Sequence, residues 1–256
     1  MKFESYIGID HSGAATPVTT RSATLQVYEG RGNSEPTMVL SPASKPNKRR
    51  NWNRLEITRW LIERLSQRDR CIVAIDHGFS FPISYFNRNE LKSWPQFLSD
   101  FAEHWPTDAA DATVEQFRSA SQRSGEPSEL RLTERWTSSA KSVFRFDVQG
   151  SVAKSTHAGL PLLKMIRDEV SGLHFWPFDG WRFKSGKSVI AETYPSLFRN
   201  RYPHESRTVD QQDAYSIACW LRDMDSMDRL DDFSSPPLTD SQKEIATLEG
   251  WILGVY

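Results

Sequence analysis

The sequence predicts an α/β fold whose mixed sheet has three antiparallel strands, a helix and then parallel strands, flanked by helices and carrying a helical insertion. Two apolar runs, Tyr6 to Asp10 and Cys71 to Asp76, have the length and the β-branched content of buried strands. A third apolar run, Ser188 to Glu192, also ends on an acid. Segments with helical spacing separate these runs, and such an order is typical of an α/β sheet.

The first third of the chain predicts a strand meander, then a helix and a fourth strand. Apolar and polar residues alternate at Ala23, Leu25 and Val27, which is typical of a strand with one buried face. Turn residues follow, and Pro42 stops the third strand. The expected strands are Phe3 to Asp10, Ala23 to Tyr28, Thr37 to Leu40 and Cys71 to Asp76, with a helix from Leu55 to Arg68 before the last of them.

The rest of the chain predicts more helix than strand, within a single domain of residues 1–256. Residues 89–132 have a helical pattern broken by Pro95, Pro106 and a turn at Gly125, which predicts a helical insertion. The other expected elements are a short strand at Ser142 to Val148, a helix at Ala153 to Val170, an aromatic strand or loop at His174 to Trp181, a strand at Val189 to Glu192, and helices at about 209–224 and 239–253.

The composition limits the classes of function. A chain of 256 residues buries a sizeable core without disulfides, and its net charge of −1 leaves only local patches to attract nucleic acid. Cys71 and Cys219 lie in apolar runs and are expected to be buried thiols, as in a reducing cytoplasm. No apolar stretch is long enough to cross a membrane and the first residues lack a signal-peptide pattern, so we expect a cytoplasmic protein without a membrane partner.

Acidic residues recur where the expected strands end. Asp10, Asp76 and Glu192 each close an apolar run, and ligands of open α/β sheets bind at that edge. Asp210 and Asp213 stand three apart at the start of a helix, so they share one helix face. Asp210 alone could be a capping or first-turn acid. The five acids together predict a shared site for a divalent cation.

Several short motifs together resemble a known family. Three expected strands, a helix and a fourth strand, with acids ending strands one and four, resemble the ribonuclease H-like fold, and the acid pair on the later helix resembles its Holliday-junction-resolvase branch. The chain most resembles the predicted ribonuclease H-like nucleases called domain of unknown function 429. The residues that carry this resemblance are Gly8-Ile9-Asp10, Ala74-Ile75-Asp76-His77-Gly78, Gly150-Ser151-Val152, Glu192-Thr193-Tyr194-Pro195, Asp210-Gln211-Gln212-Asp213-Ala214-Tyr215 and Glu249-Gly250-Trp251-Ile252-Leu253-Gly254.

The resemblance implies a nuclease that uses two Mg²⁺ or Mn²⁺ ions to hydrolyse phosphodiester bonds of DNA or RNA. Asp10 is expected to bridge the two ions, Asp76 and Glu192 to hold one, and Asp213 to hold the other with or without Asp210. The resolvase branch usually has Glu where this chain has Asp76. Junction resolvases are dimers, so a homodimer is a further possibility.

Basic and histidine residues are candidates for contacts with the substrate. His77, like His11, could transfer a proton or be an ordinary turn residue. The segment from Gly150 to Thr156 lacks the P-loop pattern but could offer Lys154 and a helix start to a phosphate. The cluster Lys48, Arg49, Arg50 and Arg54, with Trp52 inside it, could contact phosphates or be a solvated loop, and Arg131 is one of several further cations around the insertion.

Two other functions remain open at this point. Turns such as Asp10-His11-Ser12-Gly13 and Asp76-His77-Gly78 also fit, loosely, an ATP-binding protein of the actin and sugar-kinase-like superfamily, although those proteins usually duplicate the fold. The other possibility is a non-catalytic nucleic-acid-binding or protein adaptor that keeps the acids for stability. ATP binding would distinguish the first alternative, and function without the acids would distinguish the second.

Overall fold

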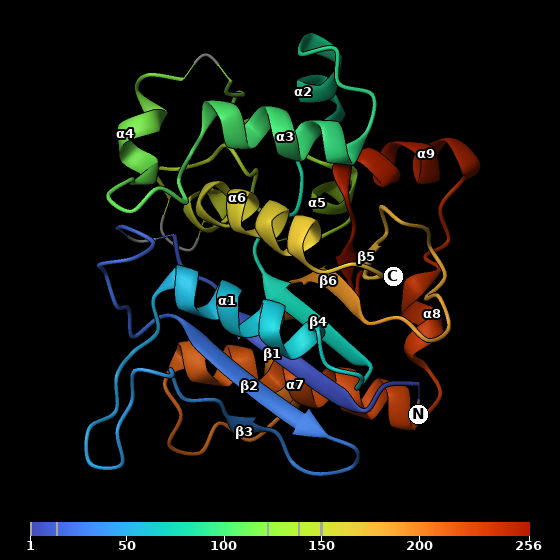
Figure 1. The fold of residues 1–256 in the computed structure, drawn as a ribbon. Coiled ribbons are helices and arrows are strands. Elements are labelled where there is room, and N and C mark those ends of the chain that lie inside the picture. The colour runs from blue at the N-terminus through green and yellow to red at the C-terminus, as the bar shows by residue number, and fades with distance from the viewer. Residues whose placement is uncertain (1, 14, 122, 138, 149–150) are drawn as a thin grey trace.

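A computed structural model describes residues 2–256, apart from residues 14, 122, 138, 149 and 150. Gly150, one of the residues that carry the family resemblance, therefore lies outside the described residues. The described part has a mixed seven-stranded sheet with helices on both faces (Figure 1), as the sequence predicts at the level of an α/β class.

The sheet combines an antiparallel edge with a parallel centre. Its order is β3-β2-β1-β4-β6-β5, and β7 pairs with β6 off this path. The β1–β2 and β2–β3 pairs are antiparallel, whereas β1–β4 and all pairs with β6 are parallel. The strands are β1 Ser5–Asp10, β2 Gln26–Arg31, β3 Thr37–Met38, β4 Cys71–Asp76, β5 His174–Trp176, β6 Val189–Thr193 and β7 Ile252–Leu253.

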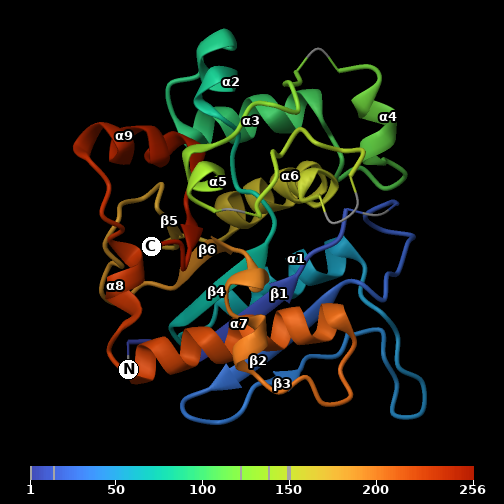
Figure 2. The same cartoon turned by 180° about the vertical axis from the view of Figure 1, so that it is seen from behind.

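The helices form two unequal layers. On one face α1 and α6 lie against the sheet with α3 beyond α6, and on the other face α7 crosses β1 and β2 (Figure 2). No helix in the described ranges is long and apolar enough to span a bilayer. The helices are α1 Arg54–Leu65, α2 Ile83–Arg88, α3 Trp94–His104, α4 Val114–Arg118, α5 Leu132–Trp136, α6 Ala153–Glu169, α7 Val209–Ser226, α8 Leu230–Ser234 and α9 Asp240–Glu249, with 3₁₀ turns η1 Pro195–Leu197 and η2 Arg199–Arg201.

The alternation of side chains along β1 decides which residues meet α7. Ile7 and Ile9 join the core formed with α1 and α6, while Tyr6 joins the core on the side of α7. Because successive strand residues point to opposite faces, Gly8 and Asp10 share the face of Tyr6. The acid that ends β1 therefore belongs to the α7 side of the sheet.

The second strand begins and ends three residues later than predicted, the third ends at Met38 rather than Leu40, and two other predicted segments change type. Ser142 to Val148 forms turns rather than a strand. The last helix ends at Glu249 instead of continuing to residue 253, because Gly250 has φ 77°, which breaks a right-handed helix. Ile252 and Leu253 then pair with β6 as the short strand β7.

Candidate functional site

Asp10 and Asp76 stand side by side at the carboxyl edge of the sheet. β1 and β4 are parallel neighbours, and their register pairs Asp10 with Asp76. Neighbouring strands lie roughly 4.8 Å apart, and paired residues of a parallel ladder point to the same face. The two strands are therefore adjacent, and their carboxyl ends are level.

Gly8 brings α7 close to these two acids. A Cβ on Gly8 would overlap the backbone of Ala214 and Ala218, so the helix reaches this distance only because the strand residue has no side chain. The helix N-cap is Thr208, which forms a reciprocal capping box with Gln211. Asp210 is thus a first-turn acid rather than the N-cap.

Four aspartates perturb one another at this edge, and we call Asp10, Asp76, Asp210 and Asp213 the aspartate cluster. The pKa of Asp10 is raised well above its ordinary value by burial and by the other three carboxylates. Burial, Asp213 and Glu192 raise the pKa of Asp76 to about 8, although Arg199 opposes them. Burial raises the pKa of Asp213 to about 6, again against Arg199. Negative charge at this edge is therefore only partly compensated.

Asp213 carries an unsatisfied oxygen. Its Oδ2 accepts a hydrogen bond of 3.3 Å from Arg199, which also donates to Ser196. Its Oδ1 is buried and has no hydrogen-bonding partner among the described residues. A buried carboxylate oxygen without a donor is costly unless something else satisfies it. Arg199 is not among the residues predicted for the site. In the sequence it is marked only by a basic run just after the third strand that ends on an acid.

The cluster is not arranged as a finished metal site. Across the described ranges, no group of three or more His, Cys, Asp and Glu side chains is placed to hold a metal ion. The four aspartates interact through their charges, which reach farther than coordination bonds do.

Glu192 does not belong to the cluster, contrary to the prediction that it shares an ion with Asp76. Arg131 donates to both of its carboxylate oxygens at 2.6 and 2.7 Å, and the Phe79 N–H donates to it at 2.9 Å. Glu192 and Arg131 are both almost completely buried. The charge of a carboxylate held by a bidentate guanidinium and an amide is already matched inside the protein, so Glu192 has little to gain from a cation.

Arg131 also holds Glu134, and we call Arg131, Glu134 and Glu192 the arginine network. Its Nε donates to Glu134 at 2.8 Å, and both side chains are about 1% exposed. Burial by itself lowers the pKa of Arg131, but the two glutamates outweigh this effect and raise it. The sequence shows only the i,i+3 spacing of Arg131 and Glu134, and no local pattern connects either residue to Glu192.

His77 lies away from the aspartates, which argues against its predicted catalytic role. It is 3% exposed, its ring packs against His11 and Phe79, and its Nδ1 bonds the carbonyl of Gly78. Its other ring edge lies against Gly159 of α6, on the face of the sheet opposite α7. Burial lowers its pKa to about 4, so the ring is neutral and part of the core.

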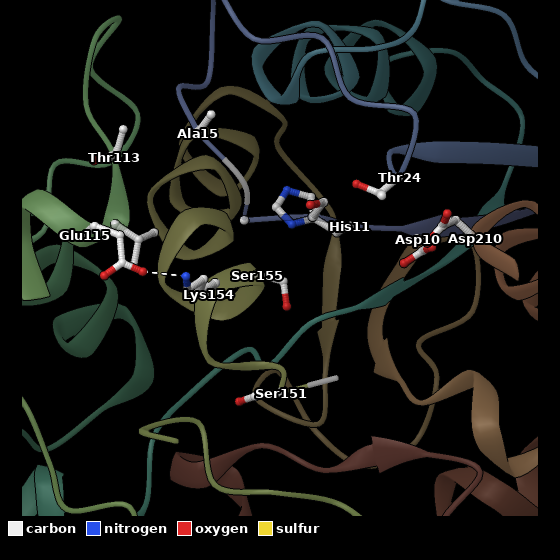
Figure 3. A pocket seen from close by; sticks show the side chains of 13 residues that line it. Asp10, His11, Ala15, Thr24, Thr113, Glu115, Ser151, Lys154, Ser155 and Asp210 are labelled. Atoms are coloured by element: carbon white, nitrogen blue, oxygen red, sulfur yellow. Dashed lines mark ion pairs between the residues drawn. The ribbon is translucent and has the colours of Figure 1, made fainter. Parts of the chain in front are cut away.

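Lys154 lines a cavity at the first turn of α6. This cavity has a volume of about 690 Å³, and its lining includes Asp10 and Asp210 of the aspartate cluster. Lys154 is half exposed and forms an ion pair of 2.5 Å with Glu115 (Figure 3). The prediction that Lys154 stands at a helix start is confirmed, and the cavity connects it with the acids.

The predicted basic cluster is divided by the fold. Lys48, Arg49 and Arg50 are exposed on a loop, and Arg49 donates to Gln26, the strand partner of Asp10. Arg54 is only 1% exposed and donates to the Ala15 carbonyl, so it is not available to an external phosphate. It starts α1, where the loop after β1 covers its side chain. Three of the four cations therefore lie exposed near the acidic edge.

Comparisons with known proteins do not identify a family for this chain. No protein-family model, no curated protein and no solved structure gives a significant match to this chain.

Proposed function

We propose that this protein is a divalent-metal-dependent nuclease with a ribonuclease H-like fold, similar to the domain of unknown function 429 family. The observation that carries the proposal is the aspartate cluster itself. Asp10 and Asp76 are in register on the two central strands, and α7 adds Asp210 and Asp213 beside them. Clusters of buried acids with raised pKa values occur mainly at functional sites.

The residues of the cluster suit Mg²⁺ or Mn²⁺. Both ions prefer carboxylate oxygens, and the buried, unpartnered Oδ1 of Asp213 is such an oxygen. Asp10, Asp76 and Asp213 would hold the metal, with Asp210 in support, whereas Arg131 already matches the charge of Glu192. A bound divalent ion supplies an activated water and stabilises charge on the leaving oxygen.

The protein's own side chains have separate tasks in this proposal. The aspartates provide negative charge that a bound cation would offset, and burial strengthens that attraction. Arg199, beside Asp213, offers a guanidinium to a nearby phosphate. Lys48, Arg49 and Arg50 lie exposed on the loop next to Gln26, where they would attract the nucleic-acid backbone.

The glycines of the two turns have packing roles that weaken the ATP-binding alternative. A Cβ on Gly13 would overlap the backbone of Lys154 and Ser155, and one on Gly78 would crowd Thr156. Both turns therefore need glycine to approach α6, whether or not a nucleotide phosphate binds there.

The test is cleavage of single-stranded, duplex, hybrid and branched nucleic acids in Mn²⁺ by the wild type and Asp10→Asn. Asn keeps the size of the side chain but loses the charge that binds a cation, so we expect a loss of activity well beyond ~100-fold. Asp168→Asn is the matched control, because Asp168 is exposed near the far end of α6 and pairs with Lys164.

Each other outcome points to a different function. Cleavage by Asp10→Asn at the wild-type rate would overturn the role of the cluster. If the wild type leaves the whole panel intact but hydrolyses ATP, the kinase-like reading replaces the nuclease. If the wild type neither cleaves nucleic acid nor hydrolyses ATP, and the wild type and Asp10→Asn bind nucleic acid equally well, the protein is an adaptor.

A further inference from the structure

The cavity beside the aspartate cluster has two chemically different ends. Asp10 and Asp210 lie at one end, Lys154 lies at the other, and His11 lies between them (Figure 3). The volume of about 690 Å³ is within the usual range for a pocket that encloses one small ligand. Hydroxyl side chains line much of the wall: Ser12, Thr24, Thr113, Ser151 and Ser155.

The basic end coincides with the start of a long helix. α6 has 17 residues, and its N-cap Val152 makes no side-chain capping bond. Backbone N–H groups and the helix dipole make such an end favourable for an anion. Gly13 packs directly on the peptide between Lys154 and Ser155, so the loop after β1 is held against this turn.

His11 provides an independent sign of a ligand. It lines the cavity, is 9% exposed, and its Nδ1 has no hydrogen-bonding partner in the described part of the chain. Buried polar atoms are nearly always paired with protein, water or ligand. The ring beside the cavity therefore has a hydrogen-bonding capacity that the described residues leave unused.

The ion pair with Glu115 shows that Lys154 can hold an anionic group. Its carboxylate lines the same cavity and pairs with the Lys154 ammonium at 2.5 Å. Both side chains are about half exposed, and an exposed ion pair of this kind contributes little stability. A doubly acidic or phosphate-bearing ligand could therefore take the place of the carboxylate at low cost.

The lining favours a sugar-phosphate backbone over a base. Apart from the imidazole of His11, the described lining residues carry no ring on which a base could stack. Hydroxyls, a lysine and a helix start are the groups that proteins use for phosphate and sugar contacts.

We propose that this cavity binds the phosphate of a single substrate strand that neighbours the phosphate being cut. Lys154 and the first turn of α6 hold that phosphate after it displaces Glu115, and the aspartate cluster lies at the scissile position. This subsite rests on the proposed nuclease function. It recognises the backbone of the strand and is indifferent to base sequence.

The experiment compares Lys154→Gln with Glu115→Gln, the two halves of the same ion pair. Binding of labelled ten-nucleotide oligo(dT) and oligo(dA) is measured by fluorescence anisotropy in Ca²⁺ over a range of salt concentrations. We expect Lys154→Gln to weaken both oligonucleotides about equally, by about 5- to 20-fold, and to reduce the salt slope by about one. Glu115→Gln should tighten both, because it frees Lys154.

A purely structural ion pair predicts a different pattern, in which both variants change binding in the same direction. Changes in the same direction would overturn the subsite. So would an unchanged affinity in Lys154→Gln, or a wild type that binds no oligonucleotide. The cleavage assay tests the nuclease separately. Opposite shifts in binding without any cleavage would support phosphate binding in the cavity but overturn the nuclease, and with it the scissile position. Cleavage with parallel shifts would support the nuclease and overturn the subsite.

Discussion

Two groups of acids lie near the same edge of the sheet, and they have opposite environments. Glu192 of β6 pairs in register with Ile75, the residue before Asp76 on β4. The arginine network surrounds Glu192 with a guanidinium and an amide. In the aspartate cluster four carboxylates interact with one another, and among the described residues Arg199 donates a hydrogen bond to Asp213.

The difference shows that burial of an acid does not by itself indicate a function. Glu192 is the more deeply buried residue, yet its charge is matched within the protein and nothing further is needed. Asp10 and Asp76 lack such a match, so burial and the neighbouring carboxylates raise their pKa values. The acids at strand ends therefore identify the acidic edge of the sheet, but they do not show which of these acids are already paired within the protein.

The largest expected effect is on the arginine network. Arg131→Met leaves two glutamates buried without their cation, so we expect a loss of about 3–5 kcal/mol in the free energy of unfolding. Denaturation in guanidinium chloride measures it. The triple variant Arg131→Met, Glu134→Leu, Glu192→Met should recover most of the loss, because it removes all three charges. A loss below about 1 kcal/mol in the single variant would contradict the network's structural role.

The next effect concerns the cluster and metal. Millimolar Mn²⁺ should raise the thermal midpoint of the wild type, since binding at 100 times Kd stabilises by about 2.7 kcal/mol. The double variant Asp10→Asn, Asp76→Asn should lose this shift. Glu134→Gln, in the arginine network, is the control and should keep it. Equal shifts in all three proteins would show that the ion binds elsewhere.

Removing one charge from the cluster should stabilise the metal-free protein. Asp76→Asn in EDTA should gain roughly 1–3 kcal/mol above pH 8 and much less at pH 4. The sign follows from the raised pKa of about 8, since Asp76 contributes stability below its unfolded pKa and loses it as pH rises through the folded value. Urea denaturation at pH 4, 7 and 9 tests this. A gain that grows toward low pH would refute the assignment.

The smallest effect on stability is expected at the exposed loop. Changing Lys48, Arg49 and Arg50 together to Gln should alter the unfolding free energy by less than about 0.5 kcal/mol, because all three are on the surface. The same variant should bind nucleic acid more weakly and with a smaller salt slope. The matched control is Arg54→Gln, which changes a buried residue of the same segment and should destabilise the fold instead.

Local pattern was enough to predict the acidic edge. Buried parallel strands consist of continuous apolar residues, so β4 has the bounds that the sequence predicts, Cys71–Asp76. The positions of Asp210 and Asp213 on one helix turn follow from helical spacing, and the structure adds that Thr208 is the cap. The sequence by itself therefore determined which acids end strands and which pair opens a helix.

Only the tertiary structure decided which of those acids have partners. Arg131 reaches Glu192 across 61 positions of sequence, and no periodicity records such a contact. Ile252 and Leu253 continue a helical pattern, yet the end of β6 that extends past β5 and the backbone of Gly250 make them a strand. Charge compensation and strand pairing depend on groups brought together by folding, whereas helix and strand spacing depends on neighbours along the chain.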